Sequence, residues 1–568
     1  MSQPSSLKSV ILPYWLSREK LGAWSLLVVL IGLLLIQTGL KVVFLIYGGE
    51  VTSALAAQDA DRFWQAIGIF LIILLVGIPL ASLSGYVRAK LGLFWRTWLT
   101  HHYLDHYLSN NHFYQIRLRQ VLANPDQRIE EDVRTLTQES LKFLVILLES
   151  GFQLIGFAGV LWSISQPLVA VLVVYAVVGT AIATLSFGKS LISINAEQLQ
   201  QEATFRYDLA RIRENTEAIA LYRGEKQELS QSWQQFGLVL RNFSRLIRWQ
   251  LGLNLFQNHY RYGTFIIPGI ILAPRLFAGD LEIGDVTQAG AAFNLMLGAL
   301  ALIVIQLQQL TNLGASIQRL TQLTATFTDL SKPLSTPLDS QEFSIKRYSG
   351  SNLSIEHLTL STPNSDKTLI QDLSFTLPPK KSLLIVGPSG IGKSSLLRAI
   401  AGLWHAGSGN ITCPESVAFL PQRPYLPPGN LQQQLRYPDS YSIIDNSQLN
   451  QVLAAVNLEH LALLPTYQET TKKHLSSNEK QKSLSSLSLG EQQRLAFARI
   501  LLKSPTYVFL DEATSALDLA NEASLYGHLQ TLGISIISVG HRPSLEKYHD
   551  YKLELFAHGE WQYSATSP

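Results

Sequence analysis

Charged residues and cysteine are both scarce in this sequence. Only 15% of its 568 residues are Asp, Glu, Lys or Arg, 47% are hydrophobic, and the mean hydropathy is +0.15. This balance argues against an ordinary soluble protein and favours a chain that keeps part of itself in lipid. The one cysteine, Cys413, excludes an internal disulfide and favours a reducing compartment. The net charge of +3 is too small to imply a nucleic-acid partner, and we expect none.

The first twenty residues lack the cleavage pattern of a signal peptide, so we expect the first apolar run to be retained as an anchor. Three stretches have no charge at all, namely 21–40, 64–87 and 150–188. A helix needs about 20 apolar residues to cross a bilayer. The third stretch is too long for one crossing, so we expect a pair of helices over roughly 142–188 with a hairpin at Ser163–Pro167. A neutral run between Asp285 and Arg319 and a more polar one at 250–274 bring the expected number of spans to six.

Lysine and arginine orient these spans. The loop 88–135 carries seven of them and 189–248 carries nine, whereas 48–61 and 163–167 carry none and 275–285 has only Arg275. Basic loops stay in the cytoplasm, so both termini should be cytoplasmic. The alternative, core helices of a soluble protein, is disfavoured by the long uncharged runs. Both basic loops also show helical spacing without breakers, which predicts helices that continue into the cytoplasm.

The composition changes near residue 331, where SKPLSTPLDSQ brings two prolines and several small polar residues. We therefore predict a membrane domain at 1–330, a linker at 331–350 and a further domain at 351–568.

A phosphate-binding loop follows an apolar strand at 381–386 in this last domain. The sequence GPSGIGKSS matches G-x-x-x-x-G-K-[ST] and precedes a helical run. Its glycines let backbone N–H groups face phosphate, Lys393 should reach the β- and γ-phosphates, and Ser394 should ligate Mg²⁺. The residues expected to bind ATP here are Gly387, Pro388, Ser389, Gly390, Ile391, Gly392, Lys393, Ser394 and Ser395.

A second apolar strand, in YVFLDEAT, ends in two acids. Asp511 should hold Mg²⁺, and Glu512 should act as the general base on the attacking water. An isolated acidic pair at a strand end is usually a solvated loop, but the phosphate-binding loop upstream favours the catalytic interpretation. The expected cofactors are thus ATP and Mg²⁺.

Four more segments, together with these two, resemble the motifs of ABC transporter ATPases in order and spacing. They are FLPQRPY, LSLGEQQR, SALD and SVGHR. The resemblance implies that Gln422 contacts Mg²⁺ and that Ser488, Gly490 and Glu491 belong to the signature that closes on ATP of a second subunit. It also implies that Asp518 links the two sites and that His541 contacts the γ-phosphate beside the catalytic Glu512 and Lys393.

Because this signature acts across a dimer and the chain has one cassette, we expect a homodimer, with a heterodimer of related half-transporters left open.

Two positions depart from the family. The signature usually reads LSGGQ, and here Leu489 and Glu491 replace a glycine and a glutamine. The aromatic residue that stacks on adenine would fall near Thr362 and is absent, and Tyr348 is either a substitute or a surface tyrosine.

The membrane half narrows the resemblance. NPDQRIEEDV at 124–133 looks like a segment of the D subfamily, which includes peroxisomal transporters of fatty acyl-CoA. The segments at 205–225, 266–285 and 402–411 look like bacterial relatives that move cobalamin or antibacterial peptides. The expected fold is an ABC exporter type, six membrane helices plus an α/β cassette, in a bacterial plasma membrane. The expected function is ATP-driven transport of an amphipathic or hydrophilic solute, such as a small molecule, a lipid-like compound or a peptide. An ATP-gated channel or regulatory subunit is the alternative.

Several polar residues interrupt the apolar spans. Glu149, His259 and Arg261 are expected to pair with one another or to contact substrate, because ionisable groups in lipid are costly. Gln306, Gln308 and Gln309 are expected to line a vestibule or to join helices. In NPDQR, Asn124 and Pro125 are expected to cap and start a helix whose first turns carry Asp126, Glu130 and Glu131, and this corner is a candidate for passing cassette motion to the membrane helices.

Overall fold

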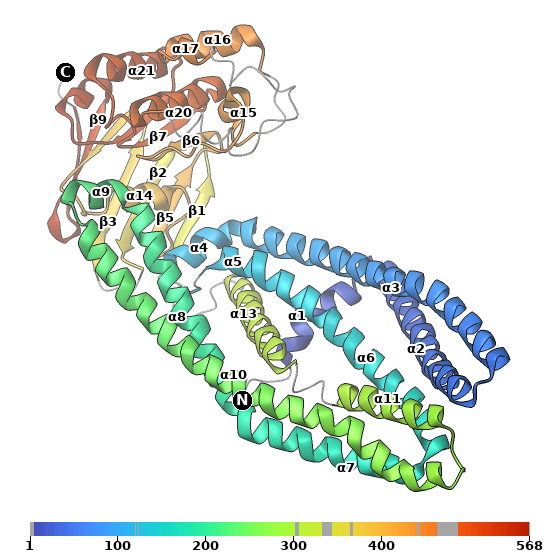
Figure 1. Ribbon diagram of the computed structural model, residues 1–568. Helices are drawn as coiled ribbons and strands as arrows, with labels where there is room; N and C mark the ends of the chain where they lie inside the picture. Colours follow the sequence, from blue (N-terminus) through green and yellow to red (C-terminus); the bar gives the residue numbers. More distant parts are fainter. Residues whose placement is uncertain are drawn as a thin grey trace. The chain divides into compact units, whose positions relative to one another are not determined.

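The computed structural model describes residues 5–119, 121–122, 124–300, 306–331, 344–363, 367–439, 444–462 and 487–566. The chain divides into two compact units, Met1–Pro333 and Leu334–Pro568. The first is built of helices and the second combines helices with β-sheets (Figure 1).

The first unit consists of long helices joined by short turns. Its elements are α1 (Ser5–Trp15), α2 (Lys20–Ala57), α3 (Ala60–Leu108), η1 (Ser109–Asn111), α4 (His112–Arg119), α5 (Pro125–Gln127), η2 (Arg128–Asp132), α6 (Val133–Ile164), α7 (Gln166–Ala183), η3 (Thr184–Gly188), α8 (Lys189–Glu214), α9 (Thr216–Tyr222), α10 (Glu225–Phe277), α11 (Ile283–Leu300) and α13 (Leu307–Ser331).

Within the described residues, four helical segments are long and apolar enough to cross a membrane: Lys20–Ala57, Ala60–Arg119, Pro125–Ile164 and Gln166–Gly188. They confirm the spans expected from the uncharged runs at 21–40, 64–87 and 150–188. The break between α6 and α7 falls at Ser165, inside the predicted hairpin, with Pro167 in the first turn of α7. The other two spans stay predictions: the polar run lies within α10, and the last run is divided between α11 and α13 by 301–305, which lie outside the described residues.

Two helices are much longer than a bilayer requires. Helix α3 has 49 residues and α10 has 53, or about 74 and 80 Å at 1.5 Å per residue, against a hydrocarbon core of about 30 Å. Helix α8 packs along α10, and the two run side by side in Figure 1. The basic loops are therefore helical, as their spacing predicts.

The polar residues of the spans find partners that differ from those expected. Glu149 accepts a hydrogen bond from Lys41 Nζ on α2, rather than from His259 or Arg261. Arg261 donates instead to Asn258 at 3.0 Å, and the ring of His259 contacts the carbonyl of Leu255 at 2.8 Å. The expected pairing was wrong because α2 packs against α6 and brings a lysine 108 positions away within reach of the carboxylate.

The corner at 124–133 also departs from its prediction. Pro125 starts α5, but Asn124 has a φ of 48° and its side chain makes no capping hydrogen bond. Asp132 instead anchors the corner: it is 3% exposed and accepts from Arg319 Nε at 2.8 Å and Nη2 at 2.5 Å. The ion pair joins this corner to α13.

The side-chain oxygens of Gln306 and Gln309 are buried without a hydrogen-bond partner, and the side chain of Gln308 lies outside the described residues.

The second unit contains two sheets. The described strands are β1 (Ile345–Ser349), β2 (Leu353–Ser361), β3 (Thr368–Leu377), β4 (Leu383–Val386), β5 (Gly407–Cys413), β6 (Val417–Leu420), β7 (Tyr507–Asp511), β8 (Ser535–Val539), β9 (Tyr551–Leu555) and β10 (Trp561–Ala565). The helices are α14 (Lys393–Ile400), α15 (Leu431–Arg436), α16 (Asn446–Ala455), α17 (Glu459–Ala462), α20 (Leu489–Lys503), α21 (Leu519–Thr531), η4 (Pro543–Tyr548) and η5 (Ala557–Gly559). The strand orders are β1-β5-β2-β3 and β10-β9-β4-β8-β7-β6.

The larger sheet has a core on each face. Leu384, Val508, Leu510 and Ile536 pack toward α20 and α21, while Leu383, Ile385, Phe509 and Ile537 pack toward α14 and the smaller sheet. The two sets alternate along each strand, as they must when both faces of a parallel sheet are covered.

Strand β1 (Ile345–Ser349) lies near the end of the segment predicted as a linker. Strand β1 pairs in parallel with β5, from Ile345 opposite Gly409 to Ser349 opposite Cys413. Its exposed side chains gave no alternation that would have signalled a strand.

Burial of Cys413 raises the pKa of its thiol, which keeps it protonated.

Candidate nucleotide site

The candidate site lies where four parallel strands end. Strands β4, β8, β7 and β6 are neighbours that run in the same direction. At their carboxyl ends, β4 leads into the phosphate-binding loop and β8 leads to His541. β7 leads into the Asp511–Glu512 pair, and β6 leads to Gln422. Motifs far apart in the sequence therefore meet at one edge of the sheet, where open α/β sheets bind their ligands.

The loop after β4 depends on its glycines. Gly387 has a φ of 147°, and a β-carbon there would lie 2.6 Å from the carbonyl oxygen of Leu555. Gly392 has a φ of 119° and immediately precedes α14. Only glycine adopts such a conformation without strain. The result is a tight loop that ends at a helix N-terminus, which is a suitable receptor for a phosphate group.

Lys393 is held within this loop. It is 6% exposed, and its Nζ donates to the carbonyls of Gly387 at 2.6 Å and Pro388 at 2.9 Å. It also lies 3.0 Å from Nε2 of His541. Burial lowers the pKa of Lys393, although the acids at 511 and 512 oppose that shift. A buried cation among carbonyl oxygens suits the binding of a polyphosphate.

A set of oxygen ligands lies next to this lysine. The hydroxyl of Ser394 donates to Asp511 Oδ1 at 3.1 Å, which places both groups together at the end of β7. Burial raises the pKa of Asp511, against the effect of the bond from Ser394. A hydroxyl, a carboxylate and, nearby, the Gln422 amide form the oxygen-rich set that Mg²⁺ prefers, so these residues fit the ion.

Glu512 is positioned by its backbone and by two side chains. Its φ is 49°, a conformation uncommon outside glycine, and its N–H donates to Val539 at 3.0 Å. Its carboxylate accepts from Gln422 Nε2 at 3.0 Å and lies 3.7 Å from His541 Nε2. The structure thus brings together Lys393, Asp511, Glu512, Gln422 and His541.

Ser488 caps a helix in a different part of the unit. It is the N-cap of α20 in a capping box: Glu491 N–H donates to the hydroxyl at 3.3 Å, and Ser488 N–H donates to the Glu491 carboxylate at 2.8 Å. The Ser488 hydroxyl donates to the same carboxylate at 2.8 Å. These bonds lower the pKa of Glu491. Within the described chain, the Ser488 side chain bonds to Glu491 alone and to nothing in the phosphate-binding loop.

The remaining predicted residues lie as follows. A β-carbon on Gly490 would lie 3.1 Å from the carbonyl of Ala516, so α20 closely approaches the SALD segment. Asp518 caps α21 by accepting from the N–H of Asn521 at 2.7 Å. Thr362 closes a loop with Lys367, and Tyr348 is 52% exposed on β1. Residues 364–366, which follow in the same segment, lie outside the described part of the chain.

Two buried residues were missed by sequence reasoning. Gln493 is fully buried, donates to the carbonyl of Gln422 at 3.1 Å and accepts from Ala516 N–H at 3.2 Å. It thereby joins α20 to the segments at Gln422 and SALD. Glu522 is 1% exposed and accepts from Thr514, Arg542 and Ser544 at 3.0, 3.2 and 2.7 Å. Only the three-dimensional network reveals these roles, although Gln493 lies within the LSLGEQQR segment and Glu522 lies four residues after SALD.

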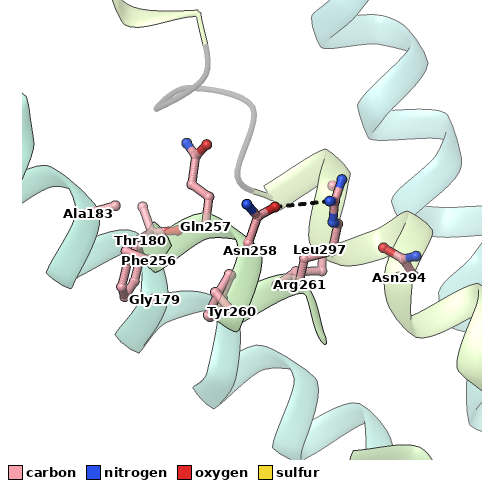
Figure 2. A pocket seen from close by; sticks show the side chains of 11 residues that line it. Gly179, Thr180, Ala183, Phe256, Gln257, Asn258, Tyr260, Arg261, Asn294 and Leu297 are labelled. Carbon is pink, nitrogen blue, oxygen red and sulfur yellow. Dashed lines mark hydrogen bonds between the residues drawn. The ribbon is translucent and has the colours of Figure 1, made fainter. Parts of the chain in front are cut away.

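The membrane unit holds a pocket of about 230 Å³ formed by α7, α10 and α11. Its polar lining side chains include Gln257, Asn258, Arg261 and Asn294, and none of the described residues that line it is acidic. Figure 2 shows Arg261 and Asn258 joined by their hydrogen bond at one side of the pocket. Phe256, Tyr260 and Leu297 supply its apolar part.

Comparison with known proteins agrees with this arrangement. Residues 7–277 match the family model "ABC transporter transmembrane region 2", and residues 370–515 match the model "ABC transporter". An uncharacterized ABC transporter ATP-binding protein of Synechocystis is 45% identical, over 95% of this chain and 81% of that protein. The chloroplastic ABC transporter D family member 2 of Arabidopsis thaliana is 37% identical, over 96% and 85%. The human lysosomal cobalamin transporter is 30% identical, over 97% and 94%.

The cassette with its strand-end site and the apolar helices of the first unit agree with both family models. The chain belongs to the ABC transporters, as an ATP-driven half-transporter that joins a membrane region to one ATP-hydrolysing cassette and has members of the D family among its relatives.

Proposed function

We propose that two copies of this chain form a homodimer that hydrolyses two ATP molecules at sites shared between the cassettes. The observation that carries the proposal is the division of the site. One cassette brings Lys393, Asp511, Glu512 and His541 together, whereas the Ser488 hydroxyl, at the start of α20, bonds to none of them. A second copy would supply Ser488 and Gly490 to the ATP held by the first.

In this site the chain's own groups have separate tasks. Backbone N–H groups of 389–395 and the Lys393 ammonium bind the phosphates. Ser394, Asp511 and Gln422 would hold Mg²⁺, which would offset the charge of the phosphate oxygens. Glu512 accepts the proton of the attacking water, and His541 keeps that carboxylate and the terminal phosphate aligned.

The solute is proposed to be a hydrophilic or amphipathic organic molecule, such as a fatty acyl, cobalamin-like or peptide compound. The pocket formed by α7, α10 and α11 supports this class, because it combines amide side chains and Arg261 with Phe256 and Leu297. Dimer closure on ATP and reopening after hydrolysis would expose such a pathway alternately to the two sides. The proposed location is a bacterial plasma membrane with both termini in the cytoplasm, since the basic loops are 88–135 and 189–248.

The Glu512→Gln variant tests the catalytic assignment. Loss of a general base should lower ATP turnover by at least about a hundredfold while ATP still binds. Glu415→Gln is a suitable control, because this exposed acid precedes β6 and so lies at the opposite end of that strand from Gln422. Uptake by proteoliposomes, offered acyl-CoA, cobalamin or peptide with ATP, would identify the solute. Wild-type turnover in Glu512→Gln would refute the assignment.

A further inference from the structure

A pocket of about 450 Å³ lies between α3 and α6, apart from both the nucleotide site and the α7–α10–α11 pocket. The two helices are in contact at its floor, where Leu141 lies 3.5 Å from the position of a β-carbon on Gly92. The charged side chains that line it are Arg88 and Arg96 from α3, and Glu139 and Lys142 from α6. The three basic groups and one acid give the lining a net charge of +2.

The acids nearby do not neutralise this cluster. Lys142 Nζ donates to Glu139 at 3.3 Å, which accounts for the one acid in the lining. Arg96 lies 3.6 Å from Glu130, but Glu130 also lies 3.4 Å from Arg134 and is therefore shared. Arg88 has no ion pair within the described part of the chain. The pocket therefore carries an excess of positive charge that a bound anion would neutralise.

The pocket lies where the apolar segments of both helices end. The uncharged run 64–87 on α3 stops immediately before Arg88, and Lys142 directly precedes the apolar stretch of α6. Both helices are long and apolar enough to span a membrane. In a bilayer, the pocket would therefore lie at headgroup level, on the side that carries the basic loops.

Apolar side chains of α3 are exposed next to the basic ones. Leu93 lines the pocket and is 60% exposed, and Phe94 is 43% exposed. Lys90 Nζ lies 5.9 Å from the Phe94 ring, but a soluble anion would leave the exposed apolar surface of both side chains uncovered. A molecule with both a phosphate and acyl chains would satisfy the charge and cover the apolar surface together.

We propose that this pocket binds the phosphate headgroup of an anionic membrane lipid. Arginine suits this role because its planar guanidinium binds two phosphate oxygens at once, and basic pockets between membrane helices are a known setting for such headgroups. The inference concerns a lipid held beside the helices rather than the transported solute, and it does not depend on the proposed nucleotide chemistry.

The test measures which lipid the full-length chain retains. The protein is offered equal amounts of phosphatidylglycerol and phosphatidylcholine, and the lipids kept by each protomer are counted by native mass spectrometry. The wild type should retain phosphatidylglycerol preferentially. In the double variant Arg88→Gln/Arg96→Gln this preference should fall by about 25-fold, since each basic side chain near an anionic headgroup contributes roughly a fivefold factor.

Arg241→Gln/Arg245→Gln is the matched control. It removes the same charge from α10, at positions that line none of the pockets described above, and it should keep the wild-type preference. Arg88→Lys/Arg96→Lys should keep most of the preference for phosphatidylglycerol. This variant shows that the loss of preference in the glutamine variant is not a loss of folding.

Three outcomes of the lipid-retention measurement would overturn the proposal. They are equal retention of both lipids by the wild type, an unchanged preference in Arg88→Gln/Arg96→Gln, and an equal loss in the control pair. Displacement of the lipid by inorganic phosphate alone would instead assign the pocket to a soluble anion and would also overturn it. Glu512→Gln should retain phosphatidylglycerol normally, so a failed nucleotide assignment and a failed lipid site are distinguishable.

Discussion

Replacing Glu522 by glutamine removes the charge of a carboxylate that is 1% exposed and accepts three side-chain hydrogen bonds. Thr514 and Arg542 both donate to Oε2, and Ser544 donates to Oε1. Glutamine keeps one acceptor oxygen for Thr514 and Arg542, but its NH₂ group can only donate, so the Ser544 hydroxyl must accept instead. The variant therefore replaces charge-assisted hydrogen bonds by neutral ones and reverses the bond to Ser544.

The expected cost follows from these contacts. Hydrogen bonds to a charged group contribute about 1.5–3 kcal/mol each, whereas bonds between neutral groups contribute about 0.5–1.5 kcal/mol. Because the Arg542 side chain is 37% exposed, solvent screens its ion pair and the sum must be discounted. We expect the free energy of unfolding of the cassette to fall by about 3 kcal/mol. For a unit of this size that corresponds to a drop of about 6–12 °C in its unfolding temperature.

Thermal unfolding of the full-length protein measures this shift. Glu546→Gln is the matched control, because it removes an exposed ion pair with Lys552 at 3.2 Å and should cost less than about 1 kcal/mol. Glu522→Gln should also slow ATP hydrolysis, because its partners Thr514 and Arg542 closely follow the site residues Glu512 and His541. If Glu522→Gln shifts the unfolding temperature no more than Glu546→Gln does, the network has no special importance for stability.

Three further predictions concern other parts of the chain. Glu491→Gln keeps an acceptor for the Ser488 capping box but removes a negative charge from the proposed phosphate receptor. KM for ATP should therefore fall by about two- to fivefold. A rise in KM would contradict this prediction. Asp132→Asn removes the carboxylate that anchors Arg319 and should lower the unfolding temperature of the membrane unit and the rate of transport, whereas Glu131→Gln should change neither. His549 is 4% exposed, and burial lowers its pKa to about 4. Since the unfolded value is about 6.5, the cassette should be most stable above that pH and lose up to about 3 kcal/mol as the pH falls from 6.5 to about 4. His549→Gln should flatten this profile in acid denaturation curves.

Sequence patterns were sufficient to predict an element wherever a local property of the chain decides its structure. The uncharged runs predict α2, α3, α6 and α7, because crossing lipid requires about 20 apolar residues and tolerates few charges. The glycine pattern predicts the loop at 387–392, because only glycine accommodates the φ angles found at Gly387 and Gly392. The apolar runs at 381–386 and in YVFLDEAT predict β4 and β7, because a strand covered on both faces reads as a nearly continuous hydrophobic run.

Patterns failed where a distant segment decides the structure. The partner of Glu149 is Lys41, and nothing in the local sequence distinguishes Lys41 from His259 or Arg261 as that partner. Strand β1 reads as linker because its ladder with β5, rather than its own apolar content, holds it. Asn124 reads as a helix cap, but the corner is anchored by Asp132 and Arg319 instead.

The same contrast holds inside the candidate site. The motifs identify Lys393, Asp511, Glu512 and His541, because each has a chemical task that requires its residue type. Gln493 and Glu522 have no such signature, since an amide and a carboxylate on a helix usually face water. Their roles follow only from burial and from the segments they join.

The most direct test of the account is whether ATP brings the phosphate-binding loop of one copy against α20 of another. Cysteines would be introduced as Ser389→Cys and Leu489→Cys in a Glu512→Gln background, with Cys413 replaced by serine. ATP should then produce a disulfide-linked dimer under mild oxidation, and its omission should leave the protein as uncrosslinked chains. If ATP yields no linked dimer while the protein still binds the nucleotide, the shared site does not exist.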